Sequence, residues 1–330
     1  MHMQKLLVAT LVSTCLASNA WAEVPVPDIT STPGAQLLEV RVTEGQIDVY
    51  SDIIYSQVTS RTGVRSLRMT LFIPKTDTLK PAIVFYPGGG FTSANRDRCV
   101  EMRMALAKAG FVVASAEYRT VPDRFPALVQ DGKSAVRYLR AHAKEFGIDA
   151  TRIGVIGASA GGYLSQMVAT TNGETAFDVG DNLHVSSDVQ AAVTIYGISN
   201  LLNVGEGYSE AIENVHASPA VTEALLVHGP AFGQFTGQSI LSDRDKALAA
   251  SPLGHIKNDM PPFLIMHGSR DTLVSPIQSR QLYEALKAKG NRADLVIVKG
   301  AGHGDLSWYQ EPVIAHVVNW FEENLKKSSK

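Results

Sequence analysis

The stretch that specifies this fold runs Ile153-Gly154-Val155-Ile156-Gly157-Ala158-Ser159-Ala160-Gly161-Gly162. The short β-branched run at its start is typical of a buried strand, and residues 161–169 have the pattern of a helix start. Between them, the G-x-S-x-G pentapeptide is typical of a sharp strand-to-helix turn that leaves a serine hydroxyl exposed above the sheet. We therefore predict that Ser159 is a nucleophile.

A serine hydroxyl is a poor nucleophile until a base takes its proton, so Ser159 predicts partners further along the chain. An apolar strand pattern at 262–268 is followed by Asp271, and a second one at 293–298 leads into the glycine-rich loop that carries His303. Serine, acid, histidine is the chain order of α/β-hydrolase triads. We expect His303 to accept the serine proton and Asp271 to fix the tautomer of the imidazole and stabilise the imidazolium.

Simpler structural roles remain open for these residues. Asp271 could simply be a turn-forming aspartate. Asp305 is a second candidate for the acid, although a neighbour two residues from His303 rarely reaches back to the ring. His267 ends an apolar strand and is expected to be structural.

A second glycine-rich loop is the candidate oxyanion hole. Residues 83–86 predict a strand that runs into Pro87-Gly88-Gly89-Gly90-Phe91. Consecutive glycines let backbone N–H groups face a carbonyl oxygen as it becomes an oxyanion. We predict that the amides of Gly89, Gly90 and Ala160 hold this oxyanion. The alternative is a flexible turn between strand and helix.

Two aromatic residues are candidates for the substrate pocket. Phe91 stands beside the oxyanion loop and Trp308 follows His303, so either ring would line the acyl or the alcohol pocket, or belong to the core. The nine histidines show no paired ligand spacing, and no metal site is expected. Ester hydrolysis through an acyl-enzyme needs no cofactor.

With these motifs in place, the chain resembles an α/β-hydrolase carboxylesterase of the broad group that contains hormone-sensitive-lipase-like, acetyl xylan and feruloyl esterases. The matching runs, within residues 50–325, are Tyr86-Pro87-Gly88-Gly89-Gly90-Phe91, Glu117-Tyr118-Arg119, Phe125-Pro126-Ala127 with Asp131, residues 152–162, His267-Gly268-Ser269-Arg270-Asp271 and Gly302-His303. The resemblance implies a serine esterase that hydrolyses short-chain carboxylic esters of small molecules or carbohydrates. Acetyl or feruloyl esters of plant polysaccharides are the substrates that it suggests.

Two departures bring the chain nearer to the carbohydrate-esterase relatives than to the lipase-like branch. Pro87 stands where that branch has the histidine of its His-Gly-Gly-Gly motif, and only a few tens of residues precede the first strand, where that branch carries a helical cap. Two other functions stay open. A peptidase related to prolyl oligopeptidases shares the serine turn but usually carries a β-propeller, and a ligand-binding protein on a hydrolase scaffold typically lacks a triad member.

Strand and helix patterns alternate along the chain in the way that builds a mostly parallel, doubly wound α/β sheet. An antiparallel pair at 53–58 and 66–73 is expected to enter it, and one long helix is expected at 126–146. Residues 197–260 are far longer than ordinary connections and are expected to form a cap insertion between late strands, over the substrate pocket. The alternative is a structural elaboration far from the site.

Residues 1–22 have the features of a cleaved signal peptide, with Lys5, a short apolar core and Ala20-Trp21-Ala22. The expected α/β-hydrolase domain is then 23–330, in the periplasm or the medium. Cys15 leaves a lipoprotein site as the alternative. Without the leader only Cys99 remains, so no intramolecular disulfide is possible. The formal charge of −2 attracts neither nucleic acid nor anionic membrane, so no stable membrane association is expected, and nothing in the sequence specifies an oligomer.

Overall fold

The computed structural model describes residues 25–60 and 63–326. The expected signal peptide, 1–22, lies outside the described residues. The described residues divide into two units, with the boundary between Thr43 and Glu44. Within the first unit, residues 25–43 contain turns and no helix or strand; one turn is held by Thr30, whose N–H donates to Asp28 Oδ1 at 2.9 Å.

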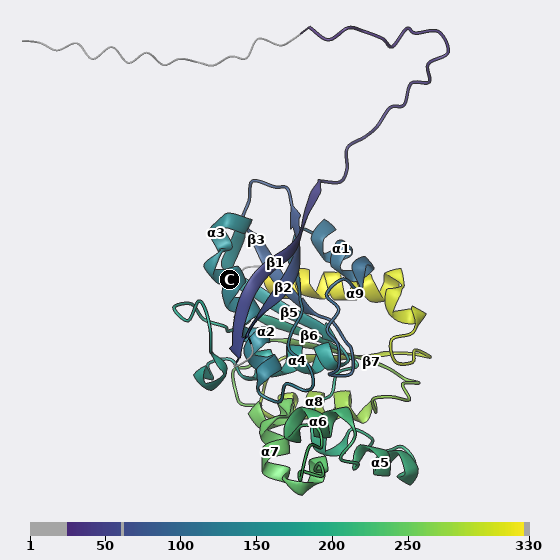
Figure 1. Cartoon of the computed structure of the whole chain (residues 1–330). Helices are drawn as coiled ribbons and strands as arrows, with labels where there is room; N and C mark the ends of the chain where they lie inside the picture. Colours follow the sequence, from purple (N-terminus) through teal and green to yellow (C-terminus); the bar gives the residue numbers. More distant parts are fainter. Residues whose placement is uncertain (1–24, 61–62, 327–330) are drawn as a thin grey trace, which may run out of the picture. The chain divides into compact units, whose positions relative to one another are not determined.

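The second unit is built on one eight-stranded sheet in the order β1-β2-β4-β3-β5-β6-β7-β8. Its strands are β1 (Ile47–Ser60), β2 (Gly63–Pro74), β3 (Lys80–Tyr86), β4 (Val112–Ala116), β5 (Ile148–Ala158), β6 (Ala191–Ile195), β7 (Phe263–Gly268) and β8 (Ala293–Val298). The pairings β1–β2 and β2–β4 are antiparallel, and the others are parallel (Figure 1). This confirms the expected mostly parallel sheet and its antiparallel entry pair.

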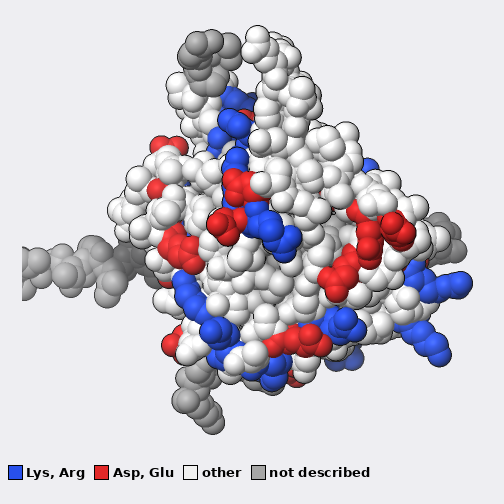
Figure 2. Space-filling model, turned by 90° about the horizontal axis from the view of Figure 1, so that it is seen from below, with Lys and Arg blue, Asp and Glu red and all other residues white. Residues whose placement is uncertain are grey.

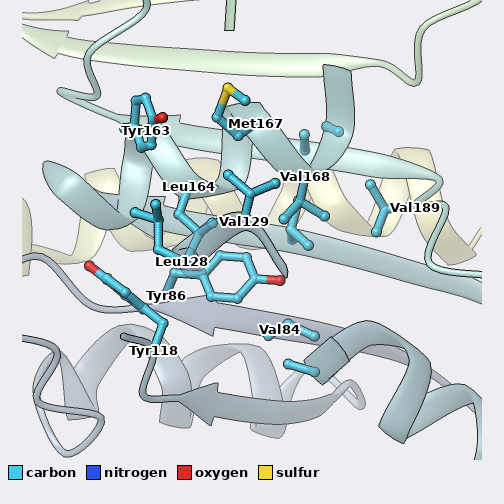
Figure 3. Close-up of a cluster of buried hydrophobic side chains, with 14 of the residues drawn as sticks. Val84, Tyr86, Tyr118, Leu128, Val129, Tyr163, Leu164, Met167, Val168 and Val189 are labelled. Atoms are coloured by element: carbon cyan, nitrogen blue, oxygen red, sulfur yellow. The ribbon is translucent and has the colours of Figure 1, made fainter. Parts of the chain in front are cut away.

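Helices cover both faces of the sheet, because alternate residues of its buried strands point to opposite sides. In β3, Val84 and Tyr86 belong to one hydrophobic cluster, with α2 (Ala127–Ala141), α4 (Ala160–Thr170) and α8 (Ile277–Ala288). Ile83 and Phe85 belong to the other, with α1 (Val100–Lys108) and α9 (Glu311–Phe321). Figure 3 shows part of the first cluster, where side chains of α2, α4 and β3 meet.

The prediction of a single long helix at 126–146 is wrong. This stretch forms two helices, α2 and α3 (Ala143–Phe146), because His142 leaves helical geometry with φ −99° and ψ 19°. The His142 ring instead stacks on Tyr138, 4.3 Å between centroids. Neither proline nor glycine marks this break in the sequence.

The long segment between β6 and β7 contains three short α-helices, α5 (Glu210–His216), α6 (Thr222–His228) and α7 (Arg244–Ala249). Figure 1 shows them gathered at one end of the sheet. Three hydrogen bonds join the segment to the loop after β7. The Tyr208 hydroxyl donates to Asp271 O at 2.9 Å, the Ser275 hydroxyl donates to Glu206 O at 2.7 Å, and Ser275 N–H donates to Val204 O at 3.4 Å. The segment is therefore fastened to the loop that carries the predicted acid. Among the described residues, no helix is long and apolar enough to cross a membrane.

Candidate active site

Ser159 occupies the turn between β5 and α4. Its backbone has φ 55° and ψ −121°, a sparsely populated conformation for a residue with a side chain. Two backbone hydrogen bonds hold it there: Ser159 N–H donates to Ile195 O at 2.9 Å, and Ser159 O accepts from Tyr163 N–H at 2.9 Å. The strand on one side and the first helical turn on the other therefore fix the position of the hydroxyl.

The glycines of the pentapeptide are required by close backbone contacts. A Cβ atom on Gly157 would lie 2.0 Å from Gly161 O, and one on Gly161 would lie 2.0 Å from Tyr86 O. Neither distance is possible for a real side chain, so both positions accept only glycine. The sequence pattern around Ser159 thus follows from how tightly the helix approaches the sheet.

The structure brings together the three residues predicted to form a triad. Ser159 Oγ lies 2.9 Å from His303 Nε2, and His303 Nδ1 lies 2.7 Å from Asp271 Oδ2. Because a carboxylate accepts at Nδ1, the neutral ring carries its proton there and presents the lone pair of Nε2 to the serine hydroxyl. This arrangement can transfer a proton from Ser159 to His303.

Asp271 follows β7 and its side chain is fully buried. Its Oδ1 accepts from the N–H groups of Leu273 and Val274, at 2.9 Å and 3.0 Å. Burial alone would raise the pKa of the Asp271 carboxyl, but hydrogen bonds from His267 and His303 outweigh it and hold this pKa well below its ordinary value. Asp271 therefore stays ionised and can stabilise a protonated His303.

His267 contacts the same carboxylate. Its Nε2 lies 3.2 Å from Asp271 Oδ2 and 3.0 Å from Val274 O, and its Nδ1 lies 2.7 Å from the Ser279 hydroxyl. Two oxygen acceptors at Nε2 place a proton on that nitrogen. Sequence reasoning gave His267 a structural role and missed this contact. The available signal was its place at the end of the strand, four residues before Asp271.

Asp305, the alternative acid, is bound by its own loop. Its Oδ2 accepts from Gly302 N–H at 2.5 Å, and its Oδ1 accepts from Ser307 N–H at 2.9 Å. These backbone hydrogen bonds lower the pKa of the Asp305 carboxyl. Among the described residues, the hydrogen-bond partner of His303 Nδ1 is Asp271 and not Asp305.

The glycine-rich loop after β3 lies against the serine turn. A Cβ atom on Gly88 would be 2.8 Å from Ala158 O and 3.2 Å from Ser159 Cβ. Gly90 has φ +59°, which glycine adopts without strain. Within the described part of the chain, the amides of Gly89, Gly90 and Ala160 donate no hydrogen bond to another protein group. Three amide donors near Ser159 are thus uncommitted.

A small cavity of about 100 Å³ opens at Ser159. Its lining residues come from the serine turn, the glycine loop, the 197–260 segment and the loop after β7: Gly90, Phe91, Ser159, Ala160, Ile198, Val204, His216, Thr222, Glu223, Leu273 and Val274. Of the two aromatic candidates, Phe91 lines this cavity and packs edge-on against Tyr163, 5.2 Å between centroids. The 197–260 segment therefore supplies part of the pocket wall.

Trp308, the other candidate, lies behind the histidine loop. Its Nε1 donates to Gly302 O at 2.8 Å, and its ring packs on Tyr196, 4.7 Å between centroids. Tyr196 in turn lies 4.5 Å from the His303 ring. The described residues that line the Ser159 cavity do not include Trp308. The structure thus places it as a support for the His303 loop.

Charged side chains of both signs are mixed on the face seen in Figure 2, which views the molecule from below Figure 1. A single-sign patch, the electrostatic footprint of a nucleic-acid-binding surface, does not dominate this face.

Comparison with known proteins gives matches over most of the chain. Residues 69–286 match the model of the BD-FAE family. A probable carboxylic ester hydrolase, LipM of Mycobacterium tuberculosis, is 30% identical over 209 residues, 63% of this chain and 45% of that protein. The chain thus spans about half the length of the curated relatives it matches.

Solved structures give the same result for the fold. A truncated carbohydrate esterase from gut microbiota has a TM-score of 0.72 at 24% identity, covering 85% of this chain and 97% of that one. The butyrate-bound esterase Est2 of Thermogutta terrifontis has a TM-score of 0.64 at 26% identity, covering 87% and 96%. These likenesses confirm the fold class predicted from the sequence.

Proposed function

This chain belongs to the BD-FAE family and has the α/β-hydrolase fold of carboxylesterases, and on that premise we propose that it is a serine esterase of short-chain carboxylic esters. The observation that carries the proposal is the hydrogen-bonded series Ser159–His303–Asp271, whose serine lines a small cavity. The names of the relatives, esterases and carboxylic ester hydrolases, support the same reaction.

The proposed reaction begins when Ser159 Oγ attacks the ester carbonyl carbon and His303 Nε2 takes the hydroxyl proton. The carbonyl oxygen becomes an oxyanion, held by the amides of Gly89, Gly90 and Ala160. His303 then gives its proton to the leaving alcohol, and the acyl group stays on Ser159. A water molecule, deprotonated by His303, releases the acid and restores the serine.

Asp271 acts through His303 in this scheme. Its buried carboxylate stabilises the imidazolium that forms in each half of the reaction, and it keeps the proton of the neutral ring on Nδ1. The low pKa of Asp271 supports this role, because a carboxyl that stays ionised can stabilise a cation throughout the working pH range.

The cavity supports a small acyl group. Pockets that hold drug-sized molecules have about 300–1,000 Å³, whereas the cavity at Ser159 has about 100 Å³. Its walls include the apolar side chains of Ile198, Val204 and Leu273. Est2 is known with butyrate and with propionate bound, which supports acyl groups of about two to four carbons. Acetyl esters, including those of plant polysaccharides, therefore come before feruloyl esters, whose aromatic ring is larger.

A series of nitrophenyl esters of increasing acyl length tests the proposal, beside acetylated xylan, methyl ferulate and a prolyl nitroanilide. We expect the highest kcat/KM on the two- and four-carbon esters. A twelve-carbon ester hydrolysed as fast as the acetate would contradict the short-chain preference. Faster cleavage of the anilide would favour the peptidase, and a folded protein inactive on every ester would favour a binding scaffold.

Export is the second part of the proposal. The leader pattern at 1–22 supports cleavage after Ala22 and a periplasmic or secreted protein. Mass spectrometry of the exported protein is expected to find Glu23 at the amino terminus. A lipidated fragment that begins at Cys15 would instead mean membrane anchoring.

A further inference from the structure

His216 stands between two cavities. It lines the cavity of about 100 Å³ at Ser159, and it also lines a neighbouring cavity of about 220 Å³ formed within the 197–260 segment. It is the one residue that both linings share in the described part of the chain. The apolar surface of the second cavity includes Leu202, Ala217 and Leu241.

Two contacts fix the His216 ring in this position. Its Nδ1 is hydrogen-bonded to Glu223 Oε1, and the Glu223 side chain is only 4% exposed. On another side the ring lies against Gly205, where an added Cβ would be 2.6 Å from His216 Cδ2. A buried carboxylate that loses its partner is costly, so Glu223 opposes movement of the ring.

The Ser159 cavity lies on the acyl side of the proposed reaction. The leaving alcohol must lie within reach of His303 Nε2 to receive its proton. The residues that line this cavity include Ser159, Gly90 and Ala160 but, within the described residues, not His303. The acyl group is thus the part of the substrate that extends from Ser159 toward His216.

We propose that His216 is the wall that limits acyl length, and that its removal joins the two cavities into one longer acyl pocket. This inference rests on the proposed esterase function. The ring stops a chain of more than about four carbons at the far end of the first cavity. Beyond it, the second cavity offers apolar surface to the additional methylenes.

The test compares kcat/KM on nitrophenyl esters of two, four, six and eight carbons for the wild type, His216→Ala and His216→Asn. The Asn side chain is smaller than the imidazole but keeps an N–H donor for Glu223, so this variant protects the fold if the Ala variant is unstable. Each methylene moved from water to apolar surroundings contributes about fourfold in affinity. We therefore expect the eight-carbon to two-carbon ratio of kcat/KM to rise at least about tenfold in both variants.

Leu241→Ala is the matched control. This substitution enlarges the second cavity but leaves the His216 ring in place, so its acyl-length profile should equal that of the wild type. The double variant His216→Ala/Leu241→Ala should favour the eight-carbon ester as His216→Ala does.

Two outcomes would show that His216 does not limit acyl length, while leaving the esterase proposal intact. Folded His216 variants could keep the wild-type acyl-length profile, or their kcat/KM could fall equally on all the esters. A wild type that hydrolyses none of the esters would overturn the proposed function and this inference with it.

Discussion

The carboxylate of Asp271 lies 2.7 Å from Nδ1 of His303, although the two residues are 32 positions apart in the chain. Asp305 is only two positions from His303, yet its oxygens accept hydrogen bonds from Gly302 and Ser307. Distance along the chain is therefore a poor guide to which acid serves the histidine. The loop after β7 meets the loop after β8 because these strands are parallel neighbours.

Asparagine at the two positions separates the candidate acids. Asp271→Asn removes the charge that stabilises the imidazolium and can favour the wrong tautomer, a change that costs about ten-thousand-fold in a serine-protease triad. We expect kcat on nitrophenyl acetate to fall at least about a hundredfold for Asp271→Asn and less than about tenfold for Asp305→Asn. The reverse ranking would make Asp305 the acid.

The low pKa of Asp271 predicts how stability changes in acid. A carboxyl whose folded pKa lies below its unfolded value, about 3.9 for Asp, stabilises the fold above that value. This contribution is lost as the pH falls below about 4 and approaches the folded pKa. The free energy of unfolding, measured with urea from pH 5 to pH 3, should therefore decline more steeply for the wild type than for Asp271→Asn. Equal declines would show that the Asp271 pKa is not lowered by folding.

His267 should matter for turnover as a positioning residue. Its Nε2 lies 3.2 Å from Asp271 Oδ2, and a hydrogen bond to a charged group contributes about 1.5–3 kcal/mol. We expect His267→Ala to lower kcat about tenfold with little change in KM, and His267→Gln, which keeps a donor, to recover part of the loss. The Ser279 hydroxyl contacts only the other nitrogen of the His267 ring, so Ser279→Ala should lower kcat less than His267→Ala does. Equal kcat values for the wild type and a folded His267→Ala would leave His267 with a packing role alone.

A methyl group at Gly161 tests the geometry of the serine turn. Its Cβ would lie 2.0 Å from Tyr86 O, so the helix or the strand must move. We expect Gly161→Ala to lower the free energy of unfolding by at least about 3 kcal/mol. Gly45→Ala is the control, because nothing lies within 4 Å of its added Cβ, and it should stay within about 0.5 kcal/mol of the wild type. Similar unfolding midpoints for the two variants would argue against the close approach at Gly161.

The sheet and the three candidate catalytic residues could be predicted because their signals are local. The glycines around Ser159 are required because one tight turn leaves no room for a side chain, and the strands before Asp271 and His303 are short apolar runs. The order of these elements along the chain then indicates the fold, since parallel strands bring their following loops to one edge of the sheet.

The pocket wall could not be predicted, because it depends on contacts between distant segments. His216 and Glu223 stand on two short helices of the 197–260 segment, and they line the Ser159 cavity only because this segment folds against the serine turn. Trp308 shows the same limit. Its place after His303 suggests a pocket residue, but its indole faces Gly302 and Tyr196. The end of α2 at His142 likewise has no helix-breaking residue to indicate it.

Hydrolysis of nitrophenyl acetate by purified Ser159→Ala protein shows whether Ser159 is the nucleophile. The substitution removes only the hydroxyl that lies 2.9 Å from His303 Nε2, and circular dichroism with a urea midpoint would show that the fold is kept. The loss of a triad nucleophile typically lowers kcat on the order of a million-fold, so we expect a rate close to that of buffer alone. A folded Ser159→Ala protein that hydrolyses the ester at the wild-type rate would exclude Ser159 as the nucleophile.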